Sequence, residues 1–362
     1  MLRRLRGLMA AGIIAAAPLI TLLMPGIAHA ATYSCVWTGG GVDSNFSTAT
    51  NWSGCNSAAP TALDTNDLIF PVTATNLTPV NDLVAATFNS ITFSGTGSAG
   101  YAISGTAFTL GGDITDTSDR SNSIANDVVV NGARAVTLSN SNVLILTGTV
   151  SGTGSVTLNG TDGSLSFVGP VTMTGSMTVT SGVLQMQARS SADATLSSVT
   201  VASGATFAYD AFQNSGVSTY TLSTPITSAG GTLDFGTPTG TGTVLNLTGL
   251  INLSGDTNVA VTDGTVVHVK GSLHGPGFKL TTANSGAVLN ESTDNTTSTP
   301  SGDIHAVAGA ATTAATTTTP GTPNTGFNLN PSKPILSLVI TLLAAGSILG
   351  VARVTRGIAS RP

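Results

Sequence analysis

The stretch Ser155-Val156-Thr157-Leu158 is one copy of a pattern in which a small residue, an apolar residue, threonine and a second apolar residue follow one another. Other copies occur at Ser90–Phe93, Ala107–Leu110, Ala135–Leu138, Ser176–Val179, Ser198–Val201 and Thr219–Leu222. From residue 135 onward, successive copies start 20, 21, 22 and 21 residues apart. A repeat of about 21 residues with an alternating strand in each unit predicts a β-solenoid, in which every repeat forms one coil.

A second series of alternating strands lies between these copies, at Gly163–Phe167, Gly182–Met186, Gly204–Tyr209 and Gly231–Phe235. Two or three strands per repeat predict an all-β fold, a right-handed parallel β-helix over residues 85–291. We expect the threonines to form an outer ladder and the apolar positions to stack inside the coils, among them Val156, Leu158, Val179, Val201 and Leu222. A β-sandwich also has many short strands, but the nearly constant repeat length favours the solenoid.

The composition argues against a nucleic-acid-binding protein. Charged residues make up only 8% of the chain, which contains one glutamate and three lysines. All seventeen acidic residues lie between Cys35 and Asn330, where only five residues are basic. Such an acidic body has no electrostatic footprint for nucleic acid, so we expect no nucleic-acid partner.

Residues 1–30 have the three parts of a secretory signal peptide. Arg3, Arg4 and Arg6 precede an apolar run from Leu8 to Met24, and Ala28-His29-Ala30 supplies small residues for cleavage. We predict export with cleavage after residue 30. An uncleaved N-terminal anchor is the alternative, because the apolar run is long for a signal peptide.

The C-terminal part predicts a stalk followed by a membrane anchor. Residues 292–333 are rich in threonine, alanine and proline, which predicts a disordered stalk. The uncharged run Ile335–Ala352 is long enough to cross a bilayer, so we predict a transmembrane helix over residues 334–353. The basic tail, residues 354–362, is expected to stay in the cytoplasm.

The pentapeptide Thr322-Pro323-Asn324-Thr325-Gly326 precedes this apolar run and basic tail. The order of the three parts resembles the cell-wall sorting signal that sortases recognise, with Thr322 where that signal has leucine. The resemblance implies cleavage after Thr325 and attachment to peptidoglycan. A simple tail anchor that holds the chain in the membrane through its C-terminal helix is the other hypothesis, and both remain open.

Cys35 and Cys55 are the only cysteines in the chain. In an exported protein, an isolated pair predicts a disulfide, which here closes a loop of about twenty residues and contributes roughly 3 kcal/mol. The same segment holds both tryptophans, Trp37 and Trp52. We predict that residues 31–84 cap the open end of the solenoid. The alternative is that the two rings form a platform on which sugars stack.

Trp37-Thr38-Gly39, the later Asn51-Trp52 and then Pro60 and Phe70 resemble the opening of proteins with autotransporter-associated β-strand repeats. Residues 147–158 and 199–207 resemble single repeats of that family. The resemblance covers about residues 36–290 and implies a parallel β-helix like that of an autotransporter passenger. No translocator barrel follows the repeats in this sequence, so we expect only the passenger-like fold to apply.

The main acidic cluster, Asp113, Asp116 and Asp119, predicts an exposed polar loop. Calcium binding is the alternative, although the spacing lacks the pattern of a calcium-binding loop. His268 and His274 are expected on the outer surface, where half of a metal site is the alternative to a surface pair. The sequence contains no catalytic triad spacing, phosphate-binding loop or paired cysteine motif, so we predict no catalytic residues and no cofactor.

Together these features predict a non-enzymatic structural or adhesive protein of the bacterial cell surface, with glycans, neighbouring cells or further copies of itself as partners. The alternative is a surface-tethered carbohydrate-active enzyme, a polysaccharide lyase or hydrolase built on a β-helix. The scarcity of arginine, lysine, histidine, glutamate and tyrosine favours the first hypothesis, because such enzymes depend on clusters of charged side chains.

Overall fold

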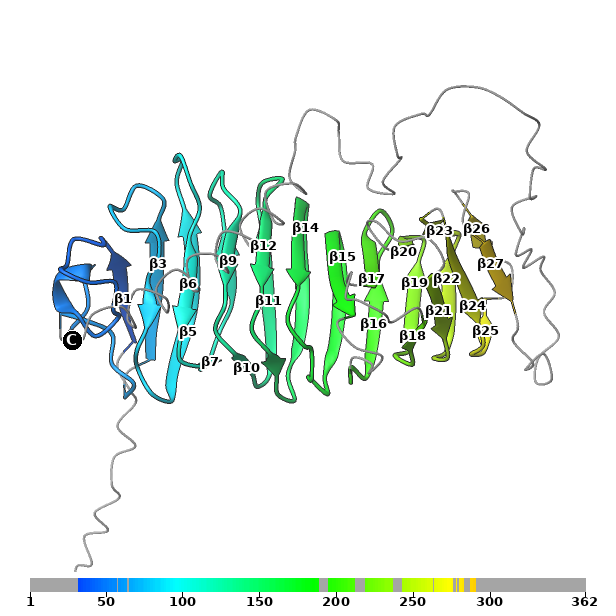
Figure 1. Ribbon diagram of the computed structural model, residues 1–362, viewed down its shortest axis with the longest axis horizontal. Helices are drawn as coiled ribbons and strands as arrows, with labels where there is room; N and C mark the ends of the chain where they lie inside the picture. The colour runs from blue at the N-terminus through cyan, green and yellow to red at the C-terminus, as the bar shows by residue number, and fades with distance from the viewer. Residues whose placement is uncertain are drawn as a thin grey trace, which may run out of the picture. The chain divides into compact units, whose positions relative to one another are not determined.

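A computed structural model describes residues 32–290 apart from 57, 64, 189–194, 212–218, 237–242, 263, 276, 277, 279 and 283–286. The predicted signal peptide, the predicted stalk, the motif Thr322–Gly326 and the span Ile335–Ala352 therefore lie outside the described residues. Within them, no helix is long and apolar enough to cross a membrane. The described residues form an all-β parallel solenoid of about nine turns, which confirms that part of the predicted fold (Figure 1).

Each coil contributes strands to up to three parallel columns, here named A, B and C. Within one coil the chain passes through column A first, then through column B and then through column C. Column A contains β1 (Thr32–Trp37), β3 (Thr65–Pro71), β5 (Ala86–Ser94), β8 (Ile114–Asp116), β11 (Ala133–Leu138), β14 (Ser155–Phe167), β15 (Ser176–Ala188), β16 (Ser198–Val201), β19 (Ile226–Ala229), β22 (Ile251–Gly255) and β25 (Leu273–His274). Successive members of this column pair in parallel.

Column B contains β4 (Val80–Asn81), β6 (Ala102–Gly105), β9 (Asn122–Ile124), β12 (Val143–Leu146), the second halves of β14 and β15, β17 (Thr206–Ala211), β20 (Thr232–Gly236), β23 (Thr257–Val261) and β26 (Leu280–Thr282). Column C contains the start of β5, then β7 (Phe108–Leu110), β10 (Val128–Val130) and β13 (Val150–Ser151). In later coils its position is taken by a separate sheet of β18 (Thr219–Leu222), β21 (Thr243–Leu247), β24 (Thr265–Val269) and β27 (Ala287–Asn290).

Inward-facing apolar residues of adjacent coils stack in register, which makes one continuous core. In column A the stack runs through Ile91, Ile114, Val136, Leu158, Val179 and Val201, all buried. In column B it runs through Leu144, Leu165, Leu184, Phe207, Leu233 and Val259, also all buried. Burial of each such side chain contributes about 1.5–3 kcal/mol, so the alternation itself stabilises the coil.

Two copies of the four-residue pattern lie outside column A. Leu222 is buried, but it pairs with Leu247 in the separate sheet, and Val201 is followed in column A by Ser228. The copy at Ala107–Leu110 likewise belongs to column C. The copy at Ala135–Leu138 is in column A, slipped by two residues so that its Val136 opposes Leu158. A two-residue slip keeps every side chain on its own face, which is why the pattern tolerates it.

Glycines at the turn between columns C and A allow the coils to approach closely. A Cβ atom on Gly154 would lie 2.2 Å from the carbonyl oxygen of Gly132, and one on Gly175 would lie 1.7 Å from that of Gly154. Neither position can accept a side chain without displacing the neighbouring backbone. Glycine therefore recurs at this turn because the backbones of neighbouring coils leave no space for a side chain there.

Parallel pairing begins upstream of residue 85, within the segment predicted as a cap. β1 pairs in parallel with β3, and β3 pairs with β5. The short 3-10 helix η1 (Ala49–Asn51) leads into β2 (Trp52–Ser53), which pairs antiparallel with β1 through Trp37 and Trp52. The β1–β2 pair is the one antiparallel pair among the described strands.

Substitution of the inner stack tests this register. Leu158→Ala should lower the free energy of unfolding by about 2–5 kcal/mol, because the fixed coils on either side cannot collapse into the cavity. Thr157→Ala, one residue away on the outer face, should cost less than about 1 kcal/mol. Urea unfolding followed by circular dichroism measures both. Equal losses for the two variants would contradict the predicted inward and outward faces.

Candidate functional site

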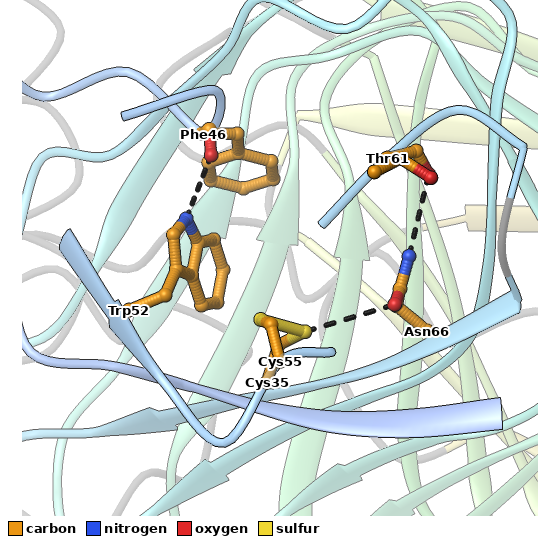
Figure 2. The surroundings of a disulfide bond; sticks show 6 residues. All are labelled: Cys35, Phe46, Trp52, Cys55, Thr61 and Asn66. Atoms are coloured by element: carbon orange, nitrogen blue, oxygen red, sulfur yellow. Dashed lines mark hydrogen bonds between the residues drawn. A yellow bond between two sulfur atoms is a disulfide. The ribbon is translucent and has the colours of Figure 1, made fainter. Parts of the chain in front are cut away.

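The predicted disulfide is present near the N-terminal end of the solenoid. Cys35, on β1, and Cys55, just after β2, are joined by an S–S bond of 2.03 Å, with 4.6 Å between their Cα atoms. The Sγ atom of Cys35 lies 3.7 Å from Oδ1 of Asn66, whose Nδ2 donates to the carbonyl of Thr61 (Figure 2). A disulfide sulfur carries no hydrogen, so the first of these is a packing contact. The bond fastens β1 to the segment after β2.

The two tryptophans are core residues and not a surface platform. Trp37 is 0% and Trp52 is 6% exposed, and their rings meet edge to face with 5.0 Å between centroids. Phe46 and Phe70 complete the cluster. The indole nitrogen of Trp52 donates to the carbonyl of Phe46 (Figure 2), and that of Trp37 donates to Asn76. Because the ring faces are covered, this arrangement excludes the sugar-stacking alternative.

The three aspartates of the predicted polar loop differ in burial and in hydrogen-bond partners. Asp116 is buried on β8 and faces inward, which corrects the expectation of an exposed loop at this position. Its carboxylate accepts bonds from the backbone and hydroxyl of Ser118 and from the amide of Asn122. Asp113 accepts from the backbone of Ala135, and Asp119 accepts from the backbone of Gly97.

These three carboxylates have separate partners, so the calcium alternative gains no support from them. Burial raises the pKa of Asp116, while the bonds from Ser118 and Asn122 oppose that effect. His268 on β24 and His274 on β25 belong to different sheets. Among the described residues, no group of three or more histidine, cysteine, aspartate or glutamate side chains could hold a metal ion.

A ladder of threonines runs along the outer side of column A. Thr157, Thr178, Thr200 and Thr227 oppose one another on four successive strands, and all four are half-buried. A shorter ladder of Thr92, Thr115 and Thr137 lies on earlier coils of the same column. The predicted outer ladder is therefore confirmed. We call the four-membered set the threonine ladder.

On the outer side of column B, several polar side chains are buried although they point away from the core. Ser166, Gln185, Asp210 and Asp234, here named the outer polar row, are between 3% and 9% exposed. They occupy outward positions on β14, β15, β17 and β20. The inward positions of the same strands are filled by core residues, among them Leu165, Leu184, Phe207 and Leu233. Both faces of this part of the sheet are thus closed to solvent.

The outer polar row is connected by hydrogen bonds between coils. The hydroxyl of Ser166 donates to Oε1 of Gln185 at 3.1 Å. Nε2 of Gln185 in turn donates to Oδ2 of Asp210 at 2.6 Å. These bonds satisfy part of the polar surface whose burial would otherwise be costly.

Both acids of the outer polar row have raised pKa values. Burial raises the pKa of Asp210 to about 7, against the lowering effect of the bond from Gln185. Burial also raises the pKa of Asp234 to about 7, and the charge of Asp210 adds to that effect. These two carboxyl groups on adjacent coils therefore titrate near neutral pH, whereas ordinary surface aspartates titrate near pH 4.

A cavity of about 10 Å³ lies between the end of column B and the separate sheet, lined by Tyr209, Tyr220, Gly236, Thr243, Leu245 and Thr265. A space of this size accommodates about one water molecule. The cavity cannot hold a sugar ring, so it offers no substrate pocket. The buried hydroxyl of Thr265 has no hydrogen-bond partner among the described residues.

Sequence reasoning missed the outer polar row. Asp210 and Asp234 stand at outward positions of the second strand series, where polar residues are expected to meet water. Nothing in the alternation reveals that this outer surface is covered. The available signal was the presence of one acid in each of two successive strands of this series, Asp210 and Asp234.

Comparison of the chain with protein-family models, with curated proteins and with solved structures gave no match. The threonine ladder, the N-terminal aromatic cluster and the outer polar row are therefore the features that bear on function.

The outer polar row predicts that the protein is more stable in mild acid than at neutral pH. A carboxyl whose pKa is near 4 when unfolded and about 7 when folded binds more protons in the folded state between these values. In metal-free buffer, the free energy of unfolding should therefore fall as pH rises from about 4 through about 7. Asp210→Asn and Asp234→Asn should each flatten this dependence, as measured by thermal unfolding across the pH range. An unchanged profile in both variants would contradict the assignment.

Proposed function

We propose that this chain is a non-enzymatic structural or adhesive protein of the bacterial cell surface. It is exported by residues 1–30 and held at its C-terminal end, and its right-handed β-helix contacts glycans, neighbouring cells or further copies of itself. The observation that carries the proposal is the threonine ladder on column A. Its chemistry suits contact with a repetitive polar surface.

The threonine ladder combines regular spacing with neutral hydroxyl groups. Neighbouring strands of a sheet are about 4.8 Å apart, so the ladder places one hydroxyl at each step along the solenoid axis. A hydroxyl both donates and accepts hydrogen bonds, as do the hydroxyl groups of sugars. Threonine on a sheet also has little rotamer freedom to lose on binding, because its side chain is β-branched. A polysaccharide with many equivalent hydroxyls is the partner class that this surface fits best.

The N-terminal cluster supports the structural half of the proposal. Trp37, Trp52, Phe46 and Phe70 pack together at the first coils, and the Cys35–Cys55 bond ties the antiparallel β2 segment to β1. We propose that this segment is a cap that shields the terminal coil. A capped solenoid avoids edge-to-edge association, since the edge strand is no longer free to pair.

Two modes of attachment are compatible with this proposal. A sortase would join Thr325 to peptidoglycan and remove residues 326–362, whereas a tail anchor would retain the span Ile335–Ala352 in the membrane. The two differ in the C-terminal peptide of the mature protein. Mass spectrometry of protein released from cells distinguishes them.

A second candidate function is that of a surface-tethered carbohydrate-active enzyme. Its supporting observation is the pair of carboxyl groups on Asp210 and Asp234, since glycoside hydrolysis uses two such groups. Both must reach the sugar, yet these side chains are only 6% and 8% exposed. Release of reducing ends from bacterial polysaccharides, lost in Asp210→Asn and Asp234→Asn, would favour this candidate over adhesion.

Arginine substitutions on the threonine ladder test the proposed function. Thr178→Arg and Thr200→Arg place bulky charges on the ladder, so each should weaken binding of the full chain to polysaccharide or bacterial cells by at least about tenfold, or about 1.4 kcal/mol. Thr221→Arg is the matched control, because Thr221 is also the threonine of the four-residue pattern but lies outside column A. Glycan arrays and cell-binding assays with thermally verified folded protein give the readout. Unchanged binding in both ladder variants would contradict the proposal.

A further inference from the structure

Three members of the outer polar row bring a hydroxyl, an amide and a carboxyl group into contact on successive coils. Ser166 on β14 directly opposes Gln185 on β15, and Asp210 lies on β17, the next strand of column B. Oγ of Ser166 is 3.1 Å from Oε1 of Gln185, and Nε2 of Gln185 is 2.6 Å from Oδ2 of Asp210. A nucleophile, an acyl group and an acid therefore meet at one side-chain amide.

The surroundings of this amide exclude most water. Ser166 is 3% exposed, Asp210 is 6% exposed and Gln185 is 9% exposed. Water therefore offers the serine hydroxyl little competition as the group that attacks the amide carbon, and it has little access to an ester formed there. Two groups held in contact within one molecule also react as if at very high concentration, about 10⁵ M or more when they are well oriented.

Asp210 lies where a proton is needed. The nitrogen of an amide is a poor leaving group until it gains a proton, and a carboxyl group within hydrogen-bond distance can supply one. Burial raises the pKa of Asp210 to about 7, although the bond from Gln185 opposes this effect. At neutral pH a large share of this carboxyl group is therefore protonated beside Nε2.

We propose that Ser166 and Gln185 form an ester cross-link between adjacent coils of column B, with Asp210 as the proton donor. Oγ of Ser166 attacks Cδ of Gln185, a C–O bond forms, and the C–N bond to Nε2 breaks. The carboxyl group of Asp210 gives its proton to the departing nitrogen and is restored by the proton of the hydroxyl. The products are one ester and one molecule of ammonia, so the reaction requires no oxidant and no co-reactant.

The register of β14 and β15 accommodates this product. In the ester, four bonds join the Cβ atoms of Ser166 and Gln185, and a chain of this length spans the distance of about 4.8 Å between neighbouring strands. The link closes a loop between residues nineteen apart in sequence, which restricts the unfolded chain and so stabilises the coils. The cross-link does not depend on the proposed adhesive function, because the threonine ladder lies in column A.

Mass spectrometry of the full chain tests the cross-link. After incubation at neutral pH, the folded wild-type protein should be lighter, by one molecule of ammonia, than the mass calculated for the disulfide-bonded chain with its observed termini. Tryptic cleavage after Arg134 and Arg189 gives one peptide that contains both Ser166 and Gln185. In the cross-linked peptide, backbone cleavage between these two residues should release no fragment ions, because the ester still joins the pieces.

Substitutions identify the reacting groups. Ser166→Ala and Gln185→Glu should each abolish the loss of ammonia, and Asp210→Asn should slow it at least about tenfold. Ser164→Ala is the matched control, because Ser164 lies on the same face of β14 but opposes Val183, and it should retain the full loss. Circular dichroism and thermal unfolding establish that each variant is folded.

Two results would overturn the proposal. The first is a folded wild-type protein that keeps its full calculated mass after prolonged incubation, and this measurement needs no variant. The second is a loss of ammonia that persists in Ser166→Ala, because it would then arise from another amide, such as Asn159 before Gly160 in the same peptide. Fragment ions from between residues 166 and 185 in the lighter wild-type peptide would have the same meaning.

Discussion

The parallel hydrogen bonds between successive coils are the constraint on which every other feature depends. They fix the distance from one coil to the next, so a residue type repeated at the coil period becomes a row on the protein. Ile91, Ile114 and Val136 form a buried row in this way, and Thr157, Thr178 and Thr200 form an outer row. The core, the threonine ladder and the outer polar row are all consequences of one register.

The same register explains where polar groups are tolerated inside the coil. Asp116 occupies an inward position between Phe93 and Leu138, where a carboxyl group should be unfavourable. Ser118 and Asn122 lie within a few residues of it and supply three hydrogen bonds at the corner between columns A and B. Local turn chemistry therefore offsets the cost of burial, and it does so without a partner from a distant coil.

Much of the fold could be predicted because alternation and a 21-residue period are visible in a single sequence. The in-register copies at Ser155, Ser176 and Ser198 and the outward threonines followed from it, and the disulfide followed from an isolated cysteine pair. The column of Leu222 could not be predicted, since strands of every column share the same alternation, and only loop length decides which column comes next. The outer polar row was missed for a related reason. Alternation assigns Asp210 and Asp234 to the outer face but carries no information on what covers that face.

Cross-linking between coils tests the column assignment most directly. In the full chain with its native disulfide intact, Thr200→Cys can be combined with Thr227→Cys or with Thr221→Cys, and each pair treated with a short thiol-specific cross-linker. Thr200 and Thr227 oppose each other on neighbouring strands, whereas Thr221 belongs to the separate sheet. The structure predicts efficient linkage of Thr200→Cys with Thr227→Cys, detected as a joined peptide by mass spectrometry, and none with Thr221→Cys. Preferential linkage of the Thr200→Cys and Thr221→Cys pair would contradict the register on which the fold and the threonine ladder depend.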